Sequence, residues 1–281
     1  MRVDLSRAPA TLAGALPRQG QRGWGGLSLT GLPLLVFFVL PLLALLARAT
    51  PASVWENLGR EETHQAIGLS LRTTLASTAL AVLFGSPLAY GLARRRLWGQ
   101  RVIETLVDLP TVLPPSVAGV ALLIAFGRRG WFGPVFDALG VSIAFTSTAV
   151  VLAQLFIAAP LYVKAAALGF AGLDRELEQA AAIDGASRWQ VLRHITLPLA
   201  YPALFSGAVL AWARALGEFG ATIIFAGNFP GRTQTMPLAI YLGFEVDMDL
   251  ALALSVILIG TSFLVLILVK VLLQRPALQD A

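Results

Sequence analysis

The stretch "EQAAAIDGASRWQVLRHITLP", residues 178–198, is a polar segment lying between two blocks of hydrophobic residues. Apolar residues recur at three- and four-residue spacing before Asp184-Gly185 and again after it, which predicts two short helices joined by a tight turn. The dipeptide Leu197-Pro198 is expected to end the second helix, because the residue before a proline disfavours helical geometry. The pattern therefore predicts a helix-turn-helix connector between two apolar blocks.

The composition of the 281-residue chain is that of a membrane protein. Hydrophobic residues make up 57% of it and charged residues 13%, with a mean hydropathy of +0.75, whereas soluble domains carry about a quarter charged residues. The net charge is +5, but the basic residues lie at the ends of apolar runs rather than among exposed aromatic residues, which argues against nucleic acid as a partner. The absence of cysteine excludes disulfides and thiolate metal sites.

Six segments are long and apolar enough to cross a bilayer, since a helical span needs about 20 residues. They are residues 27–47, 67–93, 103–126, 145–170, 202–226 and 250–273. The sequence thus predicts an all-α bundle, with one six-span domain at residues 27–273, an N-terminal tail at 1–26 and a short C-terminal tail at 274–281.

Two of the six segments have special features. The third contains Pro110, Pro114 and Pro115, and because proline removes a backbone donor, this helix is expected to be broken. The first could be read as a secretory signal, because basic residues precede it. Its apolar stretch exceeds the ~7–15 residues of a signal core, which favours an uncleaved span.

The distribution of Arg and Lys predicts the orientation. With the N-terminus in the cytoplasm, the internal regions hold most of the basic residues: Arg2, Arg7, Arg18, Arg22, Arg94, Arg95, Arg96, Arg101, Lys164, Arg175, Arg188, Arg193, Lys270 and Arg275. The external connections then hold Arg60, Arg128, Arg129 and Arg232. Because basic residues accumulate on the cytoplasmic side, residues 178–198 are predicted to face the cytoplasm. The residues alone leave open whether they form a connector lying on the membrane surface.

This segment resembles the EAA signature of inner-membrane permease subunits of ATP-binding-cassette importers, in which Glu-Ala-Ala is followed by Gly and later by Ile-x-Leu-Pro. The matching positions are Gln179, Ala180, Ala181, Gly185, Ile195, Leu197 and Pro198. Gln179 stands where the signature has Glu, and Glu178 directly precedes it. The resemblance implies that residues 171–200 form a coupling loop that docks into a cleft of a separate ATPase subunit.

The residue types of this loop suit such docking. Its small residues permit close approach of another backbone, and Glu178 and Arg188 can form charged contacts at the rim. The chain contains no GxxxxGK[ST] phosphate loop. The resemblance therefore implies a transport subunit that is not itself an enzyme and holds no cofactor or metal, with ATP and Mg used by the partner ATPase.

Three further stretches resemble the molybdate/tungstate branch of these permeases and extend the resemblance over almost all of residues 70–273. They are "SLRTTLASTALAVLFGSPLAYGLARR" at 70–95, "LPTVLPPSVAGVALL" at 109–123 and "ALGEFGATIIFAGNFPGRTQTMPLAIY" at 215–241. Sulfate/thiosulfate permeases share part of the third stretch and remain an alternative. The resemblance implies a type I importer permease fold, a homodimer in the bacterial cytoplasmic membrane, two ATPase subunits and a periplasmic oxyanion-binding protein.

Charged and polar residues inside the spans are candidates for the translocation pathway. Arg214 and Glu218 are four residues apart in the fifth predicted span, so they share one helical face and can neutralise each other. A charge at the bilayer centre costs about 2.5–3.5 kcal/mol, so this face is expected to point away from lipid. Two readings stay open: a pathway for a dianion, to which Ser116 could donate a hydrogen bond, or a structural ion pair.

A secondary transporter and a membrane-embedded enzyme are the alternatives to this interpretation. A secondary transporter driven by an ion gradient would ordinarily place acidic residues at mid-membrane depth, where Glu218 is the candidate. A membrane-embedded enzyme would need a cluster of catalytic residues at one depth, and the sequence offers none. His64 and His194 fall in different connections of the predicted topology, so a metal site is not expected.

Overall fold

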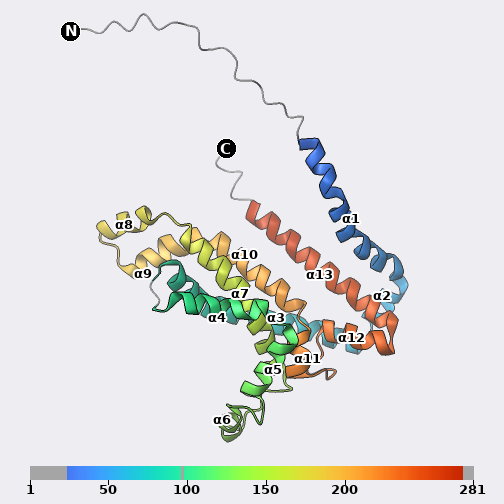
Figure 1. Cartoon of the computed structure of the whole chain (residues 1–281). Coiled ribbons are helices and arrows are strands. Elements are labelled where there is room, and N and C mark those ends of the chain that lie inside the picture. Colours follow the sequence, from blue (N-terminus) through green and yellow to red (C-terminus); the bar gives the residue numbers. More distant parts are fainter. Residues whose placement is uncertain (1–23, 96–97, 275–281) are drawn as a thin grey trace, which may run out of the picture. The chain divides into compact units, whose positions relative to one another are not determined.

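The computed structural model describes residues 24–95 and 98–274, and every regular element in these ranges is a helix (Figure 1), as predicted for an all-α protein. The chain divides into two compact units, residues 1–48 and 49–281. The first unit contributes α1 (Trp24–Arg48). Its large apolar side chains from Leu32 to Leu46 are mostly exposed, as expected of a helix whose solvent is lipid.

The second unit contains the remaining candidate spans. These are α3 (Glu61–Ala93), α7 (Ser147–Ala171), the continuous helix Arg188–Leu216 and α13 (Met248–Gln274). A bent pair, α4 (Gln100–Val112) and α5 (Pro115–Phe126), adds one more span if it is counted as one. With α1, the described residues hold five apolar helices of membrane-spanning length, or six with the bent pair, in agreement with the six predicted segments.

The break in the third predicted span lies at the consecutive prolines. α4 ends at Val112, Leu113 and Pro114 are extended, and α5 starts at Pro115 after a bend of 116°. Proline fits the first turn of a helix because that N–H has no intrahelical partner. Pro110, in contrast, lies inside α4 without ending it. The prediction of a broken helix is confirmed, and the prolines at the junction mark the break.

The fifth predicted span, residues 202–226, differs from the structure at both ends. The helix extends back through α9 (Arg188–Val191) and a π-helical turn (Leu192–Thr196) into α10 (Leu197–Leu216). It then stops at Gly217, and α11 (Gly220–Ala226) is a separate helix. The predicted span therefore joined two helices that the structure separates.

The prediction that Leu197-Pro198 ends a helix is wrong for a related reason. Leu197 keeps helical dihedral angles, and its N–H bonds to the carbonyl of Leu192, five residues earlier. In a regular α-helix the Pro198 ring would clash with the carbonyl of His194. A π-turn changes the hydrogen-bond register and so accommodates the proline. The helix therefore continues past Pro198.

Shorter helices connect the spans. They are α2 (Pro51–Leu58), α6 (Gly133–Ala138), α8 (Arg175–Ile183) and α12 (Met236–Val246). The sequence interpretation did not assign α12, because its 11 residues are too short to span a bilayer. α12 packs against α13.

The centre of the second unit is formed by α3, α7 and α10, which pack together through small residues. A side chain at Gly85 would come within 2.8 Å of Tyr162, and one at Gly207 within 2.8 Å of Ala165. The Ser86 and Tyr162 hydroxyls lie 2.6 Å apart, within hydrogen-bond distance. Such close approach is how membrane helices gain packing energy where lipid supplies no hydrophobic drive.

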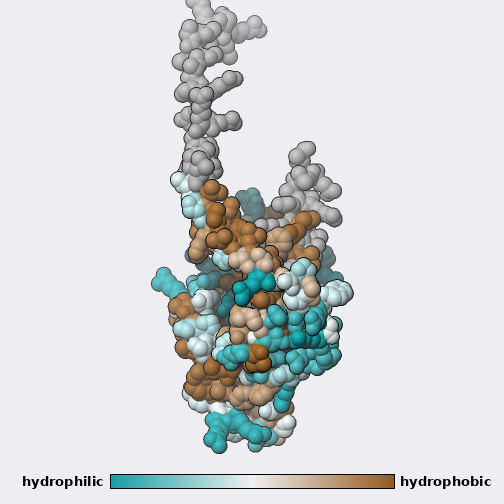
Figure 2. Space-filling view, turned by 90° about the vertical axis from the view of Figure 1, so that its right-hand side faces the viewer, coloured by the Kyte–Doolittle hydropathy of each residue, from teal (hydrophilic) through white to brown (hydrophobic). Residues whose placement is uncertain are grey.

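Helices α3 and α13 each expose large apolar side chains. Leu83 and Phe84 of α3 and Phe263 and Leu264 of α13 are each more than 60% exposed. Figure 2 shows broad areas of hydrophobic residues beside polar ones on the face in view. Surfaces of this kind are compatible with hydrocarbon and not with water, so the second unit, like α1, has the properties of a membrane domain.

Candidate functional site

The predicted helix-turn-helix at residues 178–198 is present, as α8, a turn and α9. Asp174 caps α8, with its Oδ1 accepting a hydrogen bond of 2.9 Å from the Glu176 N–H. Gly185 in the turn has a φ of +90°, a conformation that residues with a Cβ rarely adopt. Ser187 then caps α9 in a capping box with Gln190. Local chemistry therefore fixes both the start of each helix and the turn between them.

Much of this segment is exposed, including large apolar side chains. Leu177 is 50% exposed, Trp189 64% and Ile183 85%. Among the predicted coupling residues, those that are exposed are Gln179, Ala180, Gly185, Arg188 and Pro198. Those that are half-buried are Glu178, Ala181, Ile195 and Leu197. Exposed apolar residues among small ones have the character of a docking surface for another protein.

Glu178 faces the chain's own helices. Its carboxylate forms an ion pair with Arg94 at the end of α3, and its Oε1 also accepts a 2.7 Å hydrogen bond from the Thr196 hydroxyl. The Arg94 side chain is 5% exposed and Thr196 1%. The carboxylate is therefore engaged within the chain, whereas the sequence interpretation assigned it to the rim of a partner contact.

Sequence reasoning missed the contribution of Arg94 and Thr196. The sequence interpretation used Arg94 only to orient the chain. A positive charge at the end of a predicted helix could also have indicated an acidic partner there. Its contact with Glu178 places the connection between the second and third spans beside the coupling segment. This is the arrangement expected if both connections lie on one side of the membrane.

Arg214 and Glu218 form the predicted ion pair, at 2.8 Å between Nη1 and Oε2. The Glu218 side chain is 1% exposed and the Arg214 side chain 35%. The second oxygen of Glu218 accepts a 2.8 Å hydrogen bond from the Ala221 N–H in the first turn of α11. Glu218 therefore holds the junction between α10 and α11 while it neutralises Arg214.

Ser116, the third candidate for the pathway, lies in the first turn of α5 and is exposed. A Cβ placed on Gly220 would lie 2.8 Å from Pro115 and 3.4 Å from the Ser116 nitrogen. The start of α5 thus meets the start of α11. The structure brings the breaks of two discontinuous helices together, with Glu218 at one of them, an arrangement that transporters use at substrate sites.

The histidines and carboxylates of the described residues do not form a metal site. In residues 24–95 and 98–274, no group of three or more His, Asp or Glu residues could hold a metal ion. His64 contacts the carbonyl of Leu58, and His194 lies 3.1 Å from the carbonyl of Gln190. Each histidine therefore has a local backbone partner.

Comparison with known proteins supplies the family. Residues 81–277 match the family described as the inner membrane component of binding-protein-dependent transport systems. The chain is 46% identical to the molybdenum transport system permease protein ModB of Mycobacterium bovis, over 83% of this chain and 88% of that one. It is 38% identical to the putative molybdenum transport system permease protein YvgM of Bacillus subtilis, over 76% and 95%.

The fold is also found among solved structures. A bacterial ABC transporter that imports the acidic polysaccharide alginate contains a chain with a TM-score of 0.64, covering 90% of this chain and 94% of that one. At 18% sequence identity, this likeness concerns the fold alone. With its apolar helices and these relatives, the protein is a multi-pass membrane protein, and it belongs to the family of inner-membrane permease components of binding-protein-dependent transport systems.

Proposed function

We propose that this chain is the membrane-spanning permease of an ATP-binding-cassette importer for molybdate or tungstate. The observation that supports this choice of substrate is the 46% identity to a molybdenum transport permease over most of both chains. The two anions share size and charge, so the proposal takes them as one substrate class. Sulfate or thiosulfate, whose permeases share part of residues 215–241, is the outcome that would replace it.

The proposed complex contains two copies of this chain, two ATPase subunits and a periplasmic oxyanion-binding protein. The exposed Ile183 and Trp189, beside the small residues Ala180 and Gly185, support residues 178–198 as the contact with the ATPase. In this arrangement ATP and Mg belong to the ATPase, and this chain holds no cofactor. The N-terminus and the coupling segment lie in the cytoplasm, as the basic residues predict.

Transport would follow from movement of the coupling segments. ATP binding draws the two ATPases together, and the segments that they grip carry the helices with them, so that the pathway changes the side on which it is open. The contact between Glu178 and Arg94 supports this proposal, since it ties α8 to the end of α3. Motion of α8 is then passed to the central helices.

The proposed pathway passes the region where α5 and α11 begin. Arg214, with a side chain 35% exposed, is the cation that a dianion would meet, while buried Glu218 keeps it in place. Ser116, exposed at the start of α5, offers a hydroxyl donor. These three residues form the proposed lining of the pathway.

The test is uptake of radiolabelled molybdate into proteoliposomes containing the chain with its ATPase and binding protein. Uptake is expected only with ATP inside, and tungstate is expected to compete while sulfate does not. Uptake driven by a proton gradient without ATP would instead identify an ion-coupled transporter. Calorimetry of the binding protein with molybdate, tungstate and sulfate tests the proposed substrate independently of the proposed transport mechanism. A binding protein without affinity for any of these oxyanions would reject the substrate and leave the ATP-driven permease in place.

A further inference from the structure

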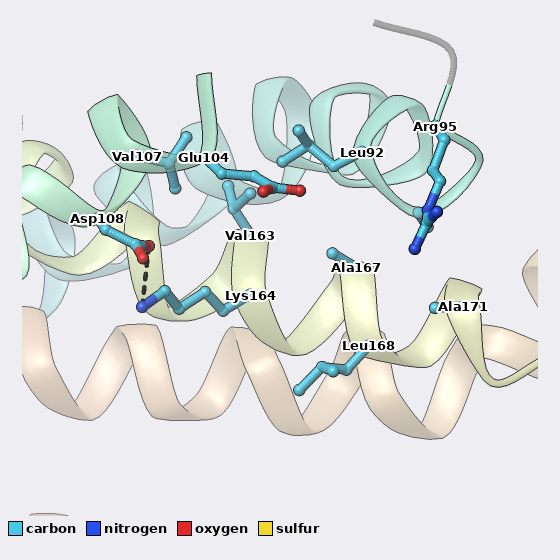
Figure 3. A pocket seen from close by; sticks show the side chains of 11 residues that line it. Leu92, Arg95, Glu104, Val107, Asp108, Val163, Lys164, Ala167, Leu168 and Ala171 are labelled. Carbon is cyan, nitrogen blue, oxygen red and sulfur yellow. Dashed lines mark ion pairs between the residues drawn. The ribbon is translucent and has the colours of Figure 1, made fainter. Parts of the chain in front are cut away.

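A groove with a charged end and an apolar end runs along α7, beside α4 and the C-terminal parts of α3 and α5. Its middle part is a cavity of about 450 Å³ (Figure 3), whose lining includes the charged residues Arg95, Glu104, Asp108 and Lys164 and the apolar residues Val107 and Val163. Figure 3 shows Arg95 reaching from the end of α3 toward α7, and Glu104 extending from α4 above Val163. Charged groups and an apolar floor therefore share one cavity.

Two smaller cavities share lining residues with this one. Arg95 and Glu104 also line a cavity of about 310 Å³ with Gln100 and Arg101. Val107 and Val163 also line a cavity of about 300 Å³, whose lining residues are all apolar. The shared residues place the three cavities next to one another, and their linings change from charged through mixed to apolar. We refer to the three together as the groove.

The apolar part has the length of one lipid chain. It follows α7 from Leu152 to Val163, which is about 16 Å at a rise of ~1.5 Å per residue. The hydrocarbon core of a bilayer is about 30 Å thick, so the apolar part covers about half of it. Pro110 of α4 and Leu122 of α5 lie on its wall, one on each side of the bend between those helices.

The charged part carries both signs. Lys164 is paired with Asp108 at 2.8 Å, and Glu104 accepts a 2.7 Å hydrogen bond from Gln100. In the part of the chain that the structure describes, Arg95 and Arg101 have no ion-pair partner, and Glu104 has none either. Two guanidinium groups can bind a phosphate, and a carboxylate beside them can accept from a primary ammonium.

We propose that this groove binds a phospholipid with a phosphoethanolamine headgroup, one acyl chain lying along α7 from Val163 to Leu152. Arg95 and Arg101 bind the phosphate, Glu104 binds the ammonium, and the apolar cavity holds the chain. The order of charged, mixed and apolar surface along the groove is the order of groups in such a lipid. The opposite charges at one end of an apolar groove match a zwitterionic lipid headgroup, whereas a second copy of this chain would not require them. This inference is independent of the transported substrate.

The experiment is native mass spectrometry of the full chain released from nanodiscs of defined lipid composition. Phosphatidylethanolamine is expected to remain bound, and phosphatidylcholine, whose ammonium carries no N–H, to be retained less. Arg95→Gln is expected to lower retention roughly two- to fivefold, the range for a partly exposed charged contact. Glu104→Gln should remove the preference over phosphatidylcholine. Arg129→Gln, an exposed arginine outside the groove, should change neither quantity.

A photoreactive acyl chain on phosphatidylethanolamine shows where the bound lipid chain lies. Labelling is expected on α7 between residues 152 and 163, and Ala159→Phe, which fills the apolar part, should abolish it. Equal labelling of Phe263 and Leu264 on the exposed face of α13 would show only bulk lipid and would overturn the proposal. Displacement of the lipid by inorganic phosphate alone, equal retention of phosphatidylglycerol, or a crosslink between two copies at Glu104→Cys would overturn it as well.

Discussion

Arg94 and Glu178 form an ion pair although 84 positions separate them in the chain. The pair joins the end of α3 to the first helix of the coupling segment. The Thr196 hydroxyl donates a hydrogen bond to the same carboxylate, which links Glu178 to the π-turn that leads into α10. One carboxylate therefore connects three elements, two of which belong to the central packing of the bundle.

Glu178→Gln is expected to destabilise the protein by about 3 kcal/mol, the lower end for removing one partner of a buried pair. The Arg94 charge, 5% exposed, then has no counter-charge. Arg94→Gln should cost less, because the Glu178 side chain is 19% exposed and keeps Thr196. Unfolding in detergent measures both. Glu176→Gln, on the exposed side of α8, is the control.

The same variants test coupling. If α8 passes its motion to α3 through this pair, Glu178→Gln in an assembled complex should lower the number of anions taken up per ATP hydrolysed. The reversed pair, Arg94→Glu with Glu178→Arg, should restore part of that ratio. An unchanged ratio in both variants would leave the pair with a structural role only.

Gly185→Ala should destabilise the turn by about 1–2 kcal/mol. Its φ of +90° costs this much for residues with a Cβ, and no atom within 4 Å of the added Cβ contributes a clash. Gly185→Asn should cost less, since asparagine tolerates positive φ better. Gly172→Ala, at a φ of −76°, serves as the comparison. Equal melting temperatures for the Gly185→Ala and Gly172→Ala variants would contradict this prediction.

The pair of Arg214 and Glu218 allows structure and transport to be separated. Arg214→Ala leaves Glu218, 1% exposed, as a buried charge without a counter-charge, which costs about 3 kcal/mol. Adding Glu218→Gln should recover much of that stability, because the amide oxygen still accepts from the Ala221 N–H without carrying a charge. Thermal unfolding of the two variants gives the comparison.

Uptake by the same double variant tests the pathway. If Arg214 binds the anion, uptake stays low even where stability and assembly return. Recovery of uptake together with stability would assign Arg214 to structure alone. Assembly with the ATPase is checked by co-purification in each case.

Arg60 and Asp247 predict a pH dependence outside the spans. The hydrogen bond from Arg60 lowers the pKa of Asp247 below its ordinary value of 3.8. A carboxyl whose pKa is lower in the folded state stabilises the fold above its unfolded pKa, and this contribution is lost as the pH falls through the folded pKa. The melting-temperature difference between wild type and Arg60→Gln should therefore be present at pH 7 and shrink below about pH 4. A difference that stays constant down to pH 2 would contradict the assignment.

The elements best predicted were those with a local signal. The helix-turn-helix at 178–198 follows from apolar spacing and from Gly185, and the break near Pro114 follows from proline chemistry. Leu197-Pro198 was misread because a π-turn, which no residue pattern announced, accommodates the proline. The separation of α10 from α11 was missed because residues 202–226 form one largely apolar run, in which Arg214 and Glu218 are the only charged residues.

The sequence by itself determined a bundle of membrane helices, the polar connector and the family signature that it carries. These depend on hydrophobicity and on residues close together in the chain. Tertiary structure alone decided that Glu178 turns inward to Arg94, that the breaks of two helices meet at Gly220, and that a charged and apolar groove follows α7. Each of these joins residues distant in sequence, and only the packing of helices sets which of them come within contact distance.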